Sequence, residues 1–522
     1  RRRSPSYTWR AGLLVGCSQI RGPMLPLQSW VSAAAVSQWH EGCLCELKQT
    51  AATATSDLAM PAIFGTSFFK QSGRVSQFCP CSIETVQRLN SELIMPRLLP
   101  LLNRTFFRYV KLDLERPCPF WDDSSSGSCQ LRDCAVEVCS EDEEVRLQQC
   151  DEEQALRLGE VQRTDAAALG AAAPSWDVSS TSCATSSTCW TEELVEPDEQ
   201  GTYVDLVDNP EQYTGYSAAA GASRVWEEWH SYNNLLLPPG CARGESDEVP
   251  VELRLFSRLT SGVHASVSSH IAANYLLDRH SGTWGLEIDE YERRLGARPE
   301  RLNNLHFAYL TALRALELAA THLSHSFAFS TGVPREDALV ARQVRELLSS
   351  HPEWPLTFDE QRAFVGVRCP STLAAAADAT CGAHEVSMRT ELLDDMRSRL
   401  RNVSRLMDCV GCGRCRLWGK LQVQGLGTAL RILYAPDRQA VLHSLRRSHV
   451  VALFNLLGRL AHSVEVARVV VPLLGAAHAT CSPRGCKAST PNSNPSVNAS
   501  PSPSPKLNPN PSPNSNPNPN PN

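Results

Sequence analysis

Three cysteines at C-x-x-C-x-x-C spacing form the motif in this sequence with the clearest chemical potential. Cys409, Cys412 and Cys415 lie within DCVGCGRCRLWGKLQVQG, residues 408–425. Cysteines in this pattern can bind a metal, bridge distant parts of the chain or exchange disulfides. A C-x-x-C pair at a helix start is easily reduced, because the helix dipole stabilises a thiolate. The helical pattern of residues 416–433 therefore favours a redox pair, Cys412 with Cys415, and leaves Cys409 to bridge elsewhere.

Two other interpretations of this motif stay open from the residues alone. One is a zinc site, which typically needs two ligand pairs of C-x₂₋₄-C or Cys/His type. The tight pairs near the N-terminus have the wrong spacing for that: they are Cys43 with Cys45 and Cys79 with Cys81. Cysteines this close do not easily bridge each other, so we expect two antiparallel bridges between the pairs. The other interpretation is that all three cysteines of the opening motif form structural disulfides.

A redox C-x-x-C needs somewhere to send its electrons, either a second dithiol or a cofactor that accepts two. Cys129, Cys134 and Cys139, with four residues between each and the next in an acidic stretch, offer such a dithiol. Taken alone, these three cysteines would be interpreted as forming a structural disulfide within the loop. Together with the C-x-x-C it suggests a relay. The sequence has neither a thioredoxin-like βαβ pattern nor a G-x-G-x-x-G turn, so a flavin would have to lie in a helical pocket.

Composition places the chain among globular proteins of an oxidising compartment. It has 522 residues, 42% of them hydrophobic and 20% charged, with a net charge of −6 and 20 cysteines. So many thiols fit a secretory route, as do the sequons at Asn103, Asn402 and Asn498. The charge gives no footprint for nucleic-acid binding. We find no apolar run that approaches the roughly 18 residues of a membrane span.

The elements that must position these cysteines are predicted to be helices. Helical periodicity recurs from about residue 203 to 475, and strand alternation is nearly absent. Residues 118–200 have the Ser-rich, acidic composition of a mobile loop. We expect residues 1–42 to be a targeting or disordered segment and 476–522 a disordered Ser/Pro/Asn-rich tail. The predicted fold is all-α, a single helical domain over residues 43–475.

Several motifs together resemble the endoplasmic reticulum oxidoreductin (Ero) family of flavin-dependent thiol oxidases. The likeness runs in order over roughly residues 43 to 472. Its motifs are CPFWDD, CQLRDCAVEVC, YVDLVDNPEQYTGY, RLTSGVHASV, RLNNLHFAYLTALRAL and RNVSRLMDCVGCGRCRLWGKLQVQGLGTALRIL. The resemblance implies a single helical domain around a four-helix FAD-binding core, which agrees with the helical periodicity.

The resemblance also implies roles for the cysteines of the C-x-x-C motif and its surroundings. Cys412 and Cys415 resemble the active-site disulfide, with Cys415 facing the flavin and Cys412 exchanging with the shuttle. Cys118 resembles the structural partner of Cys409. That bridge closes a loop of hundreds of residues, worth about 5 kcal/mol or more in the disputed chain-entropy account.

Further cysteines resemble the family's shuttle and its regulation. Cys129 with Cys134 resembles the shuttle disulfide that oxidises protein disulfide isomerase. Pairing of Cys129 with Cys150 and of Cys134 with Cys139 would hold the shuttle captive and switch the enzyme off. Cys189 resembles a further loop cysteine.

Seven residues fall where the family contacts FAD. They are Gln212, Thr214, Trp226, Ser261, His264, Arg294 and Arg301. A tryptophan offers a stacking face and arginines pair with pyrophosphate. Without the resemblance, a lone histidine on a small-residue helix face would more often be a satisfied core residue.

The sequence departs from the family pattern at three places. The family motif N-P-E-R-Y-T-G-Y has arginine where this chain has Gln212, so a cationic FAD contact is lost or weakened. The segment before Trp226 is longer, which makes Trp229 a competitor for the stacking role. The cysteine expected just after this tryptophan is absent, so the usual partner of Cys241 is missing.

The expected function is that of a thiol oxidase of the endoplasmic reticulum lumen, which makes disulfides de novo. Protein disulfide isomerase is the expected thiol donor, FAD the cofactor, and molecular oxygen the acceptor, with H₂O₂ as product. We expect a monomer without a metal or a nucleic-acid partner, and association with the luminal membrane surface is left open. The alternative is a non-enzymatic, disulfide-stabilised luminal protein that keeps the fold without the flavin.

Overall fold

The structure is a computed structural model, and it describes part of the chain. The described residues are 83–121, 135–168, 189–195, 201–214, 225, 228–229, 251–296, 299–350, 354, 383–435 and 437–480. The chain divides into two units after His478. The paired cysteines Cys43, Cys45, Cys79 and Cys81, the segment 1–42 and nearly all of the tail 476–522 lie outside the described residues.

Helices dominate the described residues, as the periodicity predicts. The shorter helices and turns are α4 (Ile83–Leu89), η2 (Asn90–Ile94), α5 (Met95–Leu102), α6 (Thr105–Arg108), α10 (Ile288–Tyr291), η5 (Glu292–Gly296), η7 (Met407–Cys409) and α16 (Arg438–His443). The longer ones are α7 (Glu141–Ala168), α9 (Val251–Ala273), α11 (Pro299–His325), α12 (Pro334–Leu348), α14 (Ala383–Leu406), α15 (Gly413–Leu433) and α17 (Arg447–Thr480). The fold is mostly helical and forms a single domain.

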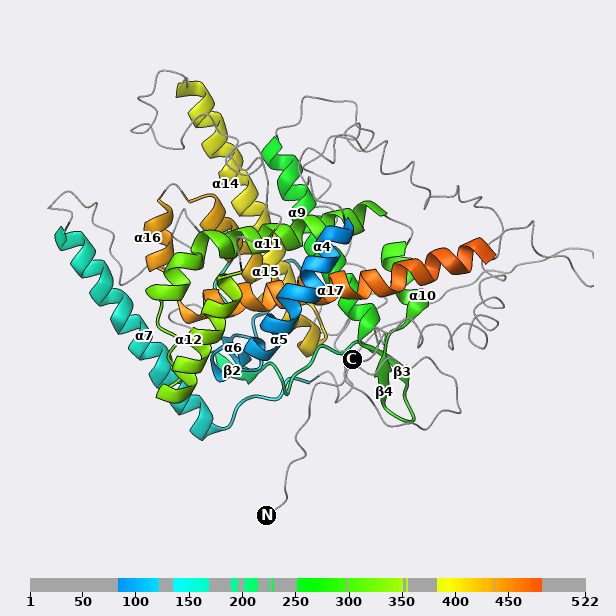
Figure 1. The fold of residues 1–522 in the computed structure, drawn as a ribbon, viewed down its shortest axis with the longest axis horizontal. Coiled ribbons are helices and arrows are strands. Elements are labelled where there is room, and N and C mark those ends of the chain that lie inside the picture. Colours follow the sequence, from blue (N-terminus) through cyan, green and yellow to red (C-terminus); the bar gives the residue numbers. More distant parts are fainter. Residues whose placement is uncertain are drawn as a thin grey trace, which may run out of the picture. The chain divides into compact units, whose positions relative to one another are not determined.

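Four long helices, α9, α11, α15 and α17, supply much of one continuous hydrophobic core (Figure 1). Two glycines let neighbouring helices approach closely. A Cβ at Gly262 of α9 would lie 2.2 Å from the carbonyl oxygen of Asn304 on α11. A Cβ at Gly425 of α15 would lie 2.4 Å from the carbonyl oxygen of Ala452 on α17. Because neither distance is possible for a real side chain, these crossings require glycine.

Two small antiparallel sheets join the helices and were not expected from the sequence. β1 (Tyr109–Leu112) pairs with β2 (Thr202–Asp205), and β3 (Tyr275–Asp278) pairs with β4 (Thr283–Gly285). Each strand has only three or four residues, too few for period-two alternation to be recognised. An isolated parallel bridge between Tyr213 and Tyr275 ties the segment after β2 to the start of β3.

Residues Glu141–Ala168, which the composition assigns to a mobile loop, form the 28-residue helix α7. Its first turn carries Glu141, Asp142, Glu143 and Glu144, and carboxylates at a helix N-terminus interact favourably with the helix dipole. The helix is docked from one side: Tyr203 donates to Asp151 at 2.7 Å, and Arg447 contacts the same carboxylate at 3.3 Å. Low apolar content therefore did not predict this helix, because the helix is held largely by polar contacts.

The sequence analysis found no apolar run that approaches the length of a membrane span, and helix α17 corrects this expectation. Among the described residues, one stretch, Arg447–Leu474, is long and apolar enough to cross a membrane by length and composition. However, 83% of its most apolar window is buried inside the protein. A helix that is apolar on all sides is also what the centre of a helical core requires. α17 is accordingly a core helix.

Candidate redox site

The C-x-x-C motif forms the first turn of α15. Cys412 is the N-cap, with extended backbone, and its sulfur accepts a hydrogen bond from the backbone N–H of Cys415 at 3.4 Å. Both cysteines are free thiols and half-buried. The rest of α15, from Leu417 to Leu433, is almost entirely buried in the core. The reactive turn is therefore fixed to the rigid centre of the domain.

The backbone carbonyl of Gln212 faces both sulfurs. It lies 3.7 Å from Cys412 Sγ and 3.4 Å from Cys415 Sγ. The segment carrying Gln212 is held from α15 and α17. Trp418 donates its Nε1–H to the carbonyl oxygen of Asn209 at 2.8 Å, and Arg459 pairs with the buried carboxylate of Glu211. Two core helices thus position this carbonyl at the thiols.

The two thiols have opposite electrostatics. The hydrogen bond from Cys415 lowers the pKa of Cys412 against the effect of burial, and the charge of Arg414 lowers it further. The pKa of Cys415 is raised well above its ordinary value by its interaction with Cys412 and by burial, while Arg294 opposes the rise. Cys412 is therefore the better thiolate of the pair and the better leaving group in exchange.

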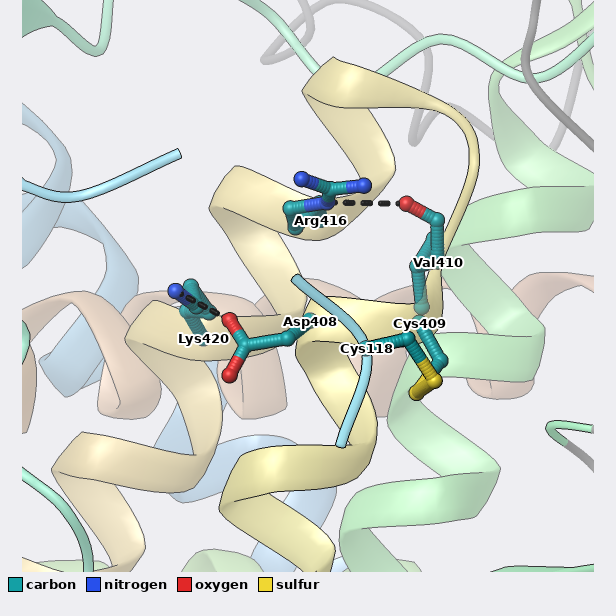
Figure 2. Close-up of a disulfide and its surroundings, with 6 residues drawn as sticks. All are labelled: Cys118, Asp408, Cys409, Val410, Arg416 and Lys420. Carbon is teal, nitrogen blue, oxygen red and sulfur yellow. Dashed lines mark hydrogen bonds and ion pairs between the residues drawn. A yellow bond between two sulfur atoms is a disulfide. The ribbon is translucent and has the colours of Figure 1, made fainter. Parts of the chain in front are cut away.

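The remaining cysteine of the motif, Cys409, is bonded in a disulfide. Cys118 and Cys409 are bonded, with their Cα atoms 4.5 Å apart and a sequence separation of 291. Figure 2 shows this bridge beside the buried ion pair between Lys420 and Asp408. Arg416 donates to the carbonyl oxygen of Val410 at 2.9 Å in the same region (Figure 2). This is the pairing that the resemblance implies.

The shuttle and regulatory cysteines are described only in part. Cys129 and Cys134 lie outside the described residues. Cys139 is a free, half-buried thiol; burial and then nearby carboxylates, Glu143 first, raise its pKa to about 12. Cys150 is free and buried on α7, and burial raises its pKa too. Cys189 is disulfide-bonded. The regulatory pairings stay predictions.

Two aromatic side chains meet where the resemblance implies the flavin ring. Trp229 and His264 are both buried, with ring centroids 5.6 Å apart and planes at 54°. The indole Nε1 of Trp229 has no hydrogen-bond partner among the described residues. Trp226, the other candidate for stacking, lies outside the described residues. A buried aromatic wall with an unpartnered donor fits a planar, polar-edged ligand such as a flavin.

The remaining predicted cofactor residues lie on two neighbouring parts of the core. Ser261, on α9, accepts a hydrogen bond from Asn304 at 3.1 Å. Arg301 donates to the carbonyl oxygen of Arg294 at 2.7 Å, and Arg294 itself pairs with Glu290. Thr214 is buried at the end of the segment that carries Gln212. The two arginines thus form a linked pair of cations, a chemistry that suits a pyrophosphate.

Sequence reasoning missed three functional neighbours of the thiols. The guanidinium carbon of Arg294 lies over the ring of Tyr213, 5.7 Å from the ring centroid. Burial raises the pKa of Tyr213 to about 12. Glu211 anchors the segment through Arg459. Arg414 is buried between the two cysteines. All three lie inside the motifs that the sequence analysis quotes. The charged and aromatic side chains between the named motif residues were therefore the features that could have identified them. No group of three potential metal ligands occurs among the described residues.

These features define a class of protein: a helical domain with a dithiol at a core helix start and a separate structural disulfide. The chain matches the family Endoplasmic Reticulum Oxidoreductin 1 (ERO1) over residues 93–467. It is 35% identical to Endoplasmic reticulum oxidoreductin-1 of Arabidopsis thaliana, covering 77% of this chain and 81% of the relative. It is 36% identical to ERO1-like protein alpha of Homo sapiens, covering 74% and 88%.

Comparison with a solved structure shows the same fold. The solved structure of Ero1p, described as the source of disulfide bonds for oxidative protein folding in the cell, superposes with a TM-score of 0.53. The identity is 24%, and the match covers 76% of this chain and 99% of that one. The chain belongs to the endoplasmic reticulum oxidoreductin family. Membership implies an oxidoreductase of the endoplasmic reticulum from a family of flavoproteins.

Proposed function

We propose that the protein is a thiol oxidase of the endoplasmic reticulum lumen that makes disulfides de novo. Reduced protein disulfide isomerase delivers two electrons to the shuttle disulfide Cys129–Cys134. The shuttle dithiol then reduces the active-site disulfide Cys412–Cys415. Bound FAD would supply the two-electron acceptor at this dithiol, with O₂ as the final acceptor and H₂O₂ as the product. The first exchange is easy only if the potential of the shuttle lies near or above the roughly −180 mV of the isomerase.

The observation that carries this proposal is the asymmetry of the C-x-x-C turn. Cys412 has a lowered pKa and borders the cation of Arg414, so it is readily released as a thiolate from a mixed disulfide with the shuttle. Cys415 has a raised pKa, and the charge that opposes the rise is that of Arg294, one of the predicted cofactor residues. A dithiol used only as a staple would need no such difference between its sulfurs.

The chain's own residues would hold the cofactor and orient the dithiol. Trp229 or Trp226 would cover the ring system together with His264, and Arg294 and Arg301 would bind the pyrophosphate. The carbonyl of Gln212 fixes the position of both sulfurs, at 3.7 and 3.4 Å. The Cys118–Cys409 disulfide keeps Cys409 from competing in exchange.

Visible absorption of the purified protein tests the proposal. We expect a flavin band that bleaches when reduced protein disulfide isomerase is added without oxygen and returns with oxygen, as H₂O₂ appears. A band that is not bleached would retain the cofactor but overturn the shuttle. A colourless protein, after expression with ample FAD, would favour the non-enzymatic alternative. The neutral side chain of Gln212, in place of a cationic FAD contact, is the reason for this alternative.

A further inference from the structure

The backbone carbonyl of Gln212 lies where the reduced form of the C-x-x-C turn can use it and the oxidised form cannot. Its oxygen is 3.7 Å from Cys412 Sγ and 3.4 Å from Cys415 Sγ, and in both contacts the thiol is the donor. The interaction with Cys412, together with burial, raises the pKa of Cys415, so the reduced pair keeps an S–H for this oxygen. A disulfide has no S–H to donate. A carbonyl held at this point therefore stabilises the dithiol relative to the disulfide.

Residues 209–213, which carry this carbonyl, are bound to the core on both sides of it. Before it, the carbonyl oxygen of Asn209 accepts a hydrogen bond from Nε1 of Trp418 at 2.8 Å. After it, the backbone N–H of Tyr213 donates to the carbonyl oxygen of Asn274 at 2.9 Å. The position of the carbonyl thus depends on the contacts that hold this segment.

Arg459 of α17 reinforces the segment in two ways. Its guanidinium forms an ion pair with the carboxylate of Glu211, and the two side chains are 9% and 2% exposed. The same guanidinium lies over the ring of Trp418, with its carbon 4.6 Å from the ring centroid. Trp418 is the side chain that donates to Asn209. One cation therefore supports two of the contacts that hold the segment.

A neighbouring histidine does not replace Arg459 as the charged partner of Glu211. Nδ1 of His270 lies 3.6 Å from the Glu211 carboxylate. Nε2 of His270 lies 2.9 Å from the carbonyl oxygen of Arg459, which can only accept, so in the neutral ring this nitrogen carries the proton. Burial lowers the pKa of His270 to about 4, so the ring is neutral near pH 7. The charge of Glu211 is therefore balanced by Arg459.

Burial makes this ion pair a firm support. An ion pair at the surface is easily replaced by water, whereas a buried one cannot be separated without leaving an uncompensated charge in the core. Glu211 directly precedes Gln212 in the sequence. A fixed side chain at Glu211 therefore restricts the backbone that presents the Gln212 carbonyl to the sulfurs.

We propose that Arg459 is a positioning residue that sets the redox equilibrium of the C-x-x-C turn: through Glu211 it holds the Gln212 carbonyl at the thiols and so favours the dithiol over the disulfide. The inference rests on the proposed function, in which a more easily reduced disulfide at the turn accepts electrons more readily from the shuttle. Arg459 acts through the segment 209–213 and not on the sulfurs themselves.

The equilibrium in question is a two-electron exchange that glutathione can report. The Cys412–Cys415 disulfide and two glutathione thiols give the Cys412 and Cys415 thiols and one glutathione disulfide. The bond between the protein sulfurs breaks, the bond between the glutathione sulfurs forms, and two electrons and two protons pass to the protein. The exchange needs neither the flavin nor the isomerase, so it can be measured apart from the oxidase reaction.

The test equilibrates the full-length protein with graded glutathione ratios, without oxygen and near pH 7. Acid quenching, alkylation and peptide mapping give the reduced fraction of Cys412 and Cys415, and thus the equilibrium constant for reduction. We compare the parent with R459K, R459M and E211Q/R459M. Because R459M leaves a carboxylate buried and unpaired, it is the variant most exposed to misfolding. The double variant removes both charges and keeps the test available, and thermal unfolding checks that each chain is folded.

The matched control removes another buried ion pair. Lys420 of α15 pairs with Asp408 beside the structural disulfide, and both side chains are 5% exposed. Lys420 also donates to the carbonyl oxygen of Asp113 at 2.7 Å. These contacts are with segments other than residues 209–213. K420M/D408L therefore loses a comparable ion pair and leaves the support of the Gln212 carbonyl in place.

We expect E211Q/R459M to lower the equilibrium constant for reduction by about three- to tenfold, the effect of losing a hydrogen bond. R459K should lie nearer to the parent, because an ammonium keeps a charge for Glu211 but cannot lie flat over Trp418. K420M/D408L should equal the parent. This difference between two losses of a buried ion pair separates a positioning role from a merely structural one.

Two kinds of outcome would contradict the inference. An unchanged or raised constant in folded E211Q/R459M, or an equal fall in the control, would overturn it and leave the proposed function standing. If Cys412 and Cys415 of the parent formed no disulfide at any glutathione ratio, the proposed function would fail, and the inference with it.

Discussion

One sequence motif contains two chemically different regions. Cys409 ends the turn after α14 and is closed in a disulfide with Cys118, beside the buried pair of Asp408 and Lys420. Cys412, three residues later, caps α15 as a free thiol with a lowered pKa. The spacing of the cysteines is the same on both sides, so spacing does not decide their chemistry.

The difference lies in what surrounds each sulfur. Around Cys409 a cross-link and an ion pair fix two segments that are far apart in sequence. Around Cys412 a helix start, a backbone carbonyl and a buried cation leave the sulfur half-buried and reactive. We expect the first region to contribute to stability and the second to disulfide exchange, and this division can be tested from either side.

Removing one reactive sulfur should have the largest effect. Replacing Cys415 by serine should lower the rate of dithiol oxidation by about a thousandfold or more, because no intramolecular disulfide can then form at the turn. Oxygen consumption with reduced protein disulfide isomerase measures it. The free energy of unfolding should stay within about 1 kcal/mol, since serine is close to cysteine in size. A variant that oxidises at the parental rate would place the chemistry elsewhere.

Removing the structural disulfide should reverse the pattern. The double variant C118S/C409S should lose about 5 kcal/mol of unfolding free energy, the chain-entropy value for a loop of this length. Denaturant unfolding of the purified protein, compared with the parent, gives the number. In conditions where the double variant is folded, dithiol oxidation should be kept. If oxidation were lost while the fold persisted, Cys409 would belong to the reactive region.

The ion pair behind the disulfide offers a finer test. Replacing Lys420 by methionine leaves the carboxylate of Asp408 buried and unpaired, and should cost about 3–5 kcal/mol of stability. The matched control is K420M/D408L, which removes both charges and should be markedly more stable than K420M alone. Thermal unfolding distinguishes them. A double variant no more stable than the single one would mean that the pair does not act as a pair.

Much of the fold follows from the sequence. α9, α11 and α15 carry a helical pattern of apolar residues, and α17 is apolar on all sides; each buries a long stretch in the core. α7 was missed because its stabilising contacts, such as the one between Tyr203 and Asp151, join residues distant in sequence. The short strands escaped for the same reason: their pairing depends on partners that no local pattern specifies.

The site is predictable in its residues and less so in its geometry. Cys412 could be placed at a helix start from the pattern that follows it, and the structure agrees. The contacts of Arg414 could not be predicted, because Ala135 and Gln212 lie 279 and 202 residues away in the sequence. Contacts between residues so far apart in the sequence arise only from tertiary packing. The neutral side chain at position 212, seen in sequence as a lost cationic contact, is an acceptor in the structure.

The smallest expected effect concerns the reactivity of thiols outside the C-x-x-C turn. After full reduction under native conditions, Cys412 should be alkylated at least about tenfold faster at pH 8 than Cys139 or Cys150. Burial raises the pKa of both latter thiols, that of Cys139 to about 12, whereas the hydrogen bond from Cys415 lowers the pKa of Cys412. Time-resolved labelling with peptide mapping measures each rate.

The sign of the pH dependence sharpens this comparison. The Cys412 rate should level off below the ordinary thiol pKa, whereas the Cys139 rate should still be rising well above it, because only the thiolate reacts. In denaturant all three thiols should react alike, which controls for the reagent. Native rates that were equal across the three cysteines would mean that position in the fold does not set thiol reactivity, and the contrast between Cys412 and its relatives on the acidic segment would fail.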